Sequence, residues 1–141
     1  MTARVAEQTR YGMGKSVPLP YEEAVERTRA ALQEEGFGVL TEIDVKATLK
    51  KKLDVDFRKY VILGACNPPL AWKAFQAEAE IGLLLPCNVI VYEEGASHSR
   101  VAVLDPLVQL GITGRGDVAP LAAEARRRLE RALQALPDAT V

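Results

Sequence analysis

Apolar segments that alternate with amphipathic ones predict five strands separated by helices and turns. The predicted strands cover residues 9–17, 37–43, 58–65, 83–92 and 100–105. The first contains two glycines, which favour an edge strand with a bend. The third contains the continuous apolar run YVILGA, which predicts burial on both faces or close to it. Pro86 cannot donate to a strand ladder, so we expect a bend or bulge near the start of the fourth.

Four stretches carry apolar residues at a spacing of three to four and therefore predict helices. They cover residues 20–35, 45–53, 68–78 and 118–136. Asp44, Asn67 and Asp117 stand where a capping side chain is expected, and Gly36 follows the first helix as its C′ residue. The segment between residues 107 and 116 contains three glycines and is expected to be a loop.

The composition fits one globular domain spanning residues 1–141, because 48% of the residues are hydrophobic and 26% are charged. A formal net charge of −1 provides no field that would attract nucleic acid. The chain has no apolar run of the length that a membrane helix needs, and its first ten residues lack the apolar core of a signal peptide. We therefore expect a cytoplasmic protein with neither a nucleic-acid nor a membrane partner.

The two cysteines of the chain each precede an asparagine, at the end of the third predicted strand and inside the fourth. If these strands pair antiparallel, both Cys-Asn dipeptides reach the same end of the sheet, with the turn at residues 42–44 nearby. This is where we expect a small ligand pocket. The candidate ligand-binding residues are Cys66, Asn67, Cys87, Asn88, Glu42 and Asp44.

Three interpretations of the paired cysteines remain open at this point. The thiols can be small core residues, because free cysteine is among the most buried residue types. They can hold a soft metal ion, although a closed zinc site needs four ligands and His98, the only histidine, is expected at the opposite end of the hairpin. They can also react, since Cys66 stands just before a helix N-terminus, where thiol pKa values fall.

The sequence contains no established catalytic or cofactor-binding motif. There is no C-x-x-C pair, no G-x-G-x-x-G after a strand and no Walker loop, so the sequence favours a protein without catalytic activity and identifies no cofactor. Trp72 is expected at the surface next to apolar residues, which is typical of subunit contacts and suggests a homodimer.

The segment TEIDVKATLKKKLDVDFRKYVILGACNPPLAWKAFQAEAEIGLLLPCNVIVYE, followed by VAVLDP, resembles the bacterial and archaeal family called domain of unknown function 302. The motifs LGACNP and LLPCNV carry this resemblance, which covers about residues 10–135. It implies an α+β fold of the TATA-binding-protein-like type, in which a curved antiparallel sheet has its long helices on one side in the order β-α-β(4)-α. The short helices expected between strands two and three and between strands three and four are additions to that order.

The family resemblance implies no specific function, and a fold shared with a DNA-binding protein is only an analogy. Our first functional hypothesis is a non-enzymatic domain that binds a small ligand or a partner near the Cys-Asn pairs. The alternative is a thiol-dependent redox or soft-metal-handling protein that uses Cys66 and Cys87.

Overall fold

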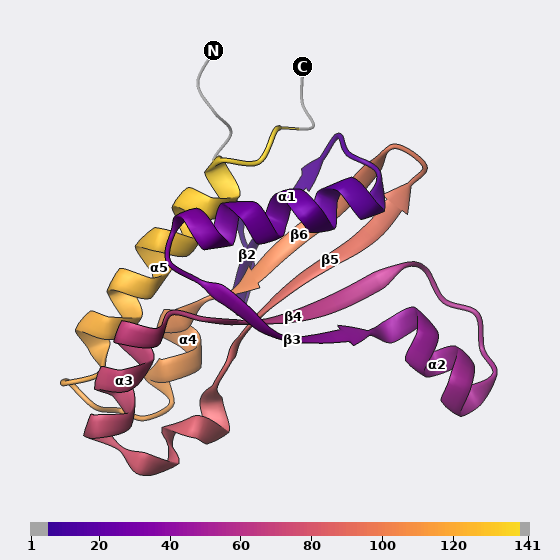
Figure 1. Ribbon diagram of the computed structural model, residues 1–141. Coiled ribbons are helices and arrows are strands. Elements are labelled where there is room, and N and C mark those ends of the chain that lie inside the picture. The colour runs from indigo at the N-terminus through magenta and orange to yellow at the C-terminus, as the bar shows by residue number, and fades with distance from the viewer. Residues whose placement is uncertain (1–5, 139–141) are drawn as a thin grey trace.

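A computed structural model describes residues 6–138 and shows an α+β architecture built on one antiparallel sheet (Figure 1). The strands are β1 (Glu7–Gln8), β2 (Gly12–Val17), β3 (Gly38–Asp44), β4 (Tyr60–Cys66), β5 (Cys87–Gly95) and β6 (His98–Leu104). The helices are α1 (Tyr21–Glu34), α2 (Val45–Leu53), α3 (Pro68–Ala77), α4 (Pro106–Gly111) and α5 (Ala119–Gln134), with a 3₁₀ helix η1 at Ala79–Leu84. The predicted domain also included residues 1–5 and 139–141, which lie outside the described residues.

The strand order in the sheet is β1-β2-β6-β5-β4-β3, and every neighbouring pair is antiparallel. Side chains alternate between two faces along each strand, as the pleat requires. One face is buried and is lined mainly by valines and leucines of β4, β5 and β6. The other face is only half-buried, and there the rings of Tyr60 and Tyr92 stack with centroids 5.2 Å apart.

Helices α1 and α5 cover the buried face, so the main core lies between them and the sheet (Figure 1). Burial follows the apolar stripe of each helix, and Leu32, Leu129 and Leu133 are almost fully enclosed. Lys15 of β2 also faces this side, and its ammonium group donates to the Leu136 carbonyl (2.6 Å) and to Asp138 (3.0 Å). This buried cation therefore attaches the segment after α5 to the sheet.

A second, smaller core forms at the end of the sheet where β4 ends and β5 begins. Helices α3 and α4, together with η1, pack there against the N-terminal half of α5. Its buried members are Ala74, Ile81, Leu110, Val118 and Ala122. Helix α2 lies at the other end of β3 and buries none of its side chains.

Several predicted element bounds are wrong for identifiable local reasons. Residues 107–116 are not all loop, because Asp105 caps a helix that begins at Pro106. The fourth predicted strand begins at Cys87 instead of residue 83, since residues 79–84 form η1. The predicted cap Asp117 lies outside α5, and its carboxylate instead binds Arg115 at 2.9 Å.

The N-terminal strand is also divided differently from the prediction. Residues 9–11 form a turn between β1 and β2, and the Thr9 side chain accepts from the Gly12 N–H at 3.0 Å. The two-residue β1 occupies the edge, so β2 is an interior strand paired along its length with β6. Strand β4 buries one face, while Tyr60 and Ile62 on its other face stay half-exposed because no helix covers them.

Candidate functional site

An apolar cavity of about 310 Å³, open to solvent where Leu40 and Phe75 are exposed, lies between the paired ends of β4 and β5 and the helices of the smaller core. Its walls come from β3, β4, β5, α3, η1, α4 and α5, and they are mostly aliphatic and aromatic. Within residues 6–138, no charged side chain lines this cavity. Representative wall residues are Phe37, Leu70, Ala71, Phe75, Leu110 and Leu121.

The LGACNP motif builds one wall by ending β4 and starting α3 at once. The Asn67 side-chain carbonyl accepts from the Leu70 N–H at 3.2 Å, which makes it the N-cap of α3. The prolines at the first two helical positions lack only N–H groups that have no intrahelical partner. Helix α3 therefore begins directly at the strand end and places Ala71, Ala74 and Phe75 along the cavity.

A glycine in the same motif allows a second wall to approach β4 closely. A Cβ at Gly64 would lie 2.1 Å from Thr41 Oγ1 and 2.8 Å from Pro86 Cγ. Real Cβ atoms essentially never come this close to another atom, so the glycine allows the side chains of Thr41 and Pro86 to meet over β4. Thr41 and Pro86 both line the cavity.

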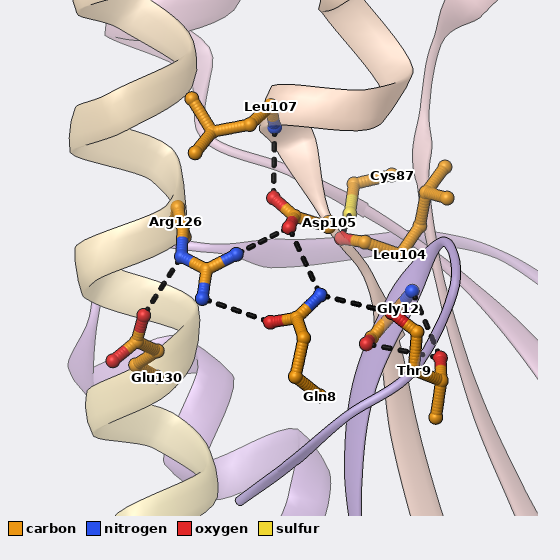
Figure 2. Close-up of polar contacts among 9 residues, drawn as sticks. All are labelled: Gln8, Thr9, Gly12, Cys87, Leu104, Asp105, Leu107, Arg126 and Glu130. Carbon is orange, nitrogen blue, oxygen red and sulfur yellow. Dashed lines mark hydrogen bonds and ion pairs between the residues drawn. The ribbon is translucent and has the colours of Figure 1, made fainter.

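A polar network fixes α4, the helix that closes the third side (Figure 2). The Asp105 side chain is 5% exposed and accepts from the Leu107 N–H at 2.9 Å, from the Gln8 amide at 3.3 Å and from the Arg126 guanidinium. Arg126 also binds Glu130 at 2.9 Å. Strand β6, helix α4 and helix α5 therefore share one carboxylate, which orients α4 against α5.

Helix α4 contributes Gln109, the most deeply buried amide side chain of the cavity wall at 5% exposure. Its Nε2 donates to the carbonyls of Leu84 and Pro86, the latter at 3.4 Å. These bonds tie α4 to η1 and to the start of β5. Among the described residues, none donates a hydrogen bond to Gln109 Oε1.

Both cysteines line the cavity, and both are free thiols. Burial raises the pKa of Cys87 to about 12, and its thiol donates to the Leu104 carbonyl at 3.4 Å. Figure 2 shows this thiol beside Leu104, the residue before Asp105, whose negative charge also raises the pKa. Burial likewise raises the pKa of Cys66. Neither thiol is therefore activated as a thiolate.

Three of the six predicted site residues line the cavity, namely Cys66, Asn67 and Cys87. As expected, the end of the third predicted strand pairs with the start of the fourth, and Ala65 lies opposite Cys87. Asn88 pairs with Gly64 and is exposed outside the cavity.

The two predicted acidic residues also lie outside the cavity wall. Glu42 forms an ion pair with Arg29 of α1 at 2.8 Å. Asp44 accepts from the Ala47 N–H at 2.9 Å and caps α2, as the sequence predicted. Glu42 and Asp44 thus interact with helices α1 and α2, away from the cavity wall.

Among the wall residues, the sequence pattern does not indicate Gln109, Leu110 and Thr41. The first two lie in the segment that was expected to be a loop, although Asp105 followed by Pro106 is a helix-start signal. Over residues 6–138 no group of three or more His, Cys, Asp or Glu side chains is placed to hold a metal ion. In the same range, no helix is long and apolar enough to cross a membrane.

Comparison with known proteins identifies the family but no activity. The family model described as "Domain of unknown function DUF302" matches residues 13–136. A crystal structure of an uncharacterized conserved DUF302 protein from Bacillus stearothermophilus is similar at 29% sequence identity, with a TM-score of 0.82. That match covers 91% of this chain and 99% of the other. No curated protein matches the chain. Because the family model spans most of its length, the chain belongs to the DUF302 family.

Proposed function

We propose that this protein binds a small, mostly apolar molecule in the cavity beside Cys66 and Cys87, without performing chemistry on it. The observation that carries this proposal is the cavity itself, about 310 Å³ with an apolar wall and a few polar groups. Ligand pockets of roughly 300–1,000 Å³ have this character. The volume places the ligand at the small end of that range.

The thiol chemistry considered above receives no support from the surroundings of the two cysteines. A nucleophilic or metal-binding cysteine must reach the thiolate form near neutral pH, and burial raises both pKa values here. The helix N-terminus that follows Cys66 does not reverse this direction. The proposal therefore uses the cysteines as part of the apolar wall.

The proposal is tested by filling the cavity and measuring whether a small aromatic probe still binds. Ala71→Phe adds a ring to α3 on the cavity side, and Gln76→Phe adds the same ring to an exposed position of that helix. Indole is a suitable probe, since an apolar cavity of about 150 Å³ already accepts benzene. At ten times its Kd a ligand stabilises the folded state by about 1.4 kcal/mol, which raises Tm by roughly 4 °C.

We expect indole to raise the Tm of the wild type and of Gln76→Phe but not that of Ala71→Phe. Isothermal titration calorimetry should give the same ranking of affinities. Equal Tm increases in all three proteins would place the indole elsewhere and contradict the proposal. Native mass spectrometry of the protein as purified provides a second test, since a retained molecule of suitable mass identifies the natural ligand class.

The finer predictions on fold and assembly remain part of this proposal. The order β2-α1-β3-β4-β5-β6-α5 supports a TATA-binding-protein-like arrangement, with the remaining elements as additions to it.

The 65% exposure of Trp72 supports self-association as a homodimer, because large exposed aromatic side chains often mark subunit contacts. Sedimentation of the wild type beside Trp72→Ser tests this second point, and a monomer at all concentrations contradicts it.

A further inference from the structure

The orientation of the Gln109 amide determines what kind of polar group the cavity accepts. Its Nε2 carries two hydrogens, and the carbonyls of Leu84 and Pro86 accept them. Carbonyl oxygens only accept, so the opposite orientation of the amide would place oxygen against oxygen. The nitrogen end is thereby fixed on η1 and the start of β5.

This orientation leaves Oε1 as the free end of a side chain that is 95% enclosed by the protein, since it is 5% exposed. No donor among residues 6–138 reaches this oxygen, and Gln109 belongs to the cavity wall. An acceptor in an apolar wall that no protein group donates to gains a hydrogen bond when a ligand donates to it. The wall thus contains a fixed site that can accept but not donate.

The other polar groups of the wall do not counter this preference. The Thr41 hydroxyl and the Cys66 thiol can each donate or accept by rotating, so they do not discriminate between ligands. The Asn67 amide nitrogen faces Gly36, a residue outside the wall, and would be 3.0 Å from a Cβ there. No wall residue within the described range is charged, so a buried carboxylate would have no cationic partner.

We infer that the cavity is selective for a neutral, compact aromatic or alicyclic molecule that donates a hydrogen bond to Gln109 Oε1. This inference rests on the proposed function and adds the ligand class. Small alcohols, phenols and N–H heterocycles fit it. Fatty acids and other carboxylates do not, because they would bring a negative charge to an acceptor inside an apolar wall.

Three bicyclic molecules of nearly the same shape separate hydrogen bonding from size. Indole donates through its N–H, benzofuran has only an acceptor oxygen, and indene has neither. Calorimetric titration of the wild type should give indole an affinity about fivefold to tenfold higher than indene, as one net hydrogen bond predicts. Benzofuran should bind no better than indene, and benzoate should bind more weakly than all three.

The variant Gln109→Met removes the acceptor while keeping a side chain of similar length. In this variant, which also loses the two hydrogen bonds from Nε2, indole and indene should bind equally well. Should Gln109→Met fail to fold, ¹⁵N-labelled wild type gives the same information. The Gln109 side-chain amide resonances should shift with indole and stay in place with indene.

The possible results separate the acceptor role of Gln109 from the proposed ligand-binding function on which it rests. Equal binding of indole, benzofuran and indene would overturn the acceptor role and leave the apolar pocket intact. A preference for indole that survives in Gln109→Met, or Gln109 resonances that do not respond to indole, would also overturn it. Failure of all three bicyclic probes to bind would contradict the proposed function itself.

Discussion

The carboxylate of Asp105 joins β6, α4 and α5, so removing it should weaken the wall that presents Gln109. We consider two substitutions at this position. Asp105→Asn keeps a side-chain oxygen that can cap α4 but removes the charge that binds Arg126. Asp105→Ala removes both. The two variants therefore separate the cap from the ion pair.

The structure sets the expected size of each effect. Breaking a buried ion pair costs about 3–5 kcal/mol when the remaining charge is stranded. Arg126 is not stranded, because its side chain is 26% exposed and still binds Glu130 and Gln8. We therefore expect Asp105→Asn to lose only the charge-assisted hydrogen bonds, about 2 kcal/mol. Loss of the cap adds about 1 kcal/mol in Asp105→Ala.

Equilibrium urea unfolding measures these differences as changes in the free energy of unfolding. Asp117→Asn is the matched control, because its ion pair with Arg115 is exposed and solvent screens such pairs. The expected order of stability is wild type, Asp117→Asn, Asp105→Asn and then Asp105→Ala. If both Asp105 variants were as stable as the control, the network of Figure 2 would not hold α4 as we describe.

Three further predictions follow from burial. Iodoacetamide should leave Cys87 unmodified in the native protein and label Cys66 more slowly than in the unfolded chain, as mass spectrometry can establish. Because burial raises the pKa of Cys87 from 9.0 to about 12, the folded state keeps its proton where the unfolded state loses it. The free energy of unfolding should therefore fall between pH 9 and 12 by up to about 1.4 kcal/mol per pH unit. In Cys87→Ala the free energy of unfolding should fall less steeply over this range. Parallel pH profiles of the two proteins would contradict this prediction. The buried Thr28 hydroxyl has no hydrogen-bond partner among residues 6–138, so Thr28→Val should stabilise the protein by about 1 kcal/mol in urea unfolding. Thr48→Val is the control, since its exposed hydroxyl binds the Asp44 carbonyl at 2.7 Å, and a destabilised Thr28→Val would show that the hydroxyl does have a partner.

The helices and strands that follow a simple apolar period were predictable from the sequence. The stripe of α5 and the capping positions Asp44 and Asn67 lie where the pattern placed them. These features depend on local interactions, so the residues within one or two turns determine them.

The missed elements depend on contacts between distant segments. The 3₁₀ helix η1 contributes Ile81 to the smaller core, and α4 is fixed by the distant residues Arg126 and Gln8. The apolar run of β4 gave no sign that one face of the sheet would stay uncovered. Which face the helices cover depends on tertiary packing, which a single-strand pattern does not contain.

Only the part of the candidate site that follows from strand pairing was predictable from the sequence. Antiparallel pairing of β4 with β5 follows from the chain order, and it brings the two Cys-Asn segments to one end of the sheet. The alternation of side chains then places Asn88 on the face opposite Cys87, because neighbouring residues of a strand point in opposite directions. Gln109 reaches the same cavity from α4, and no spacing in the sequence connects it to the cysteines.

The central claim is that the cavity between α3, α4 and the ends of β4 and β5 is a ligand site. A crystal structure of the protein grown with indole tests it most directly. We predict one indole inside the cavity, against Ala71 and Leu110, with its N–H directed at Gln109 Oε1. A structure in which wall side chains fill this space, and indole lies only on the outer surface, would contradict the account.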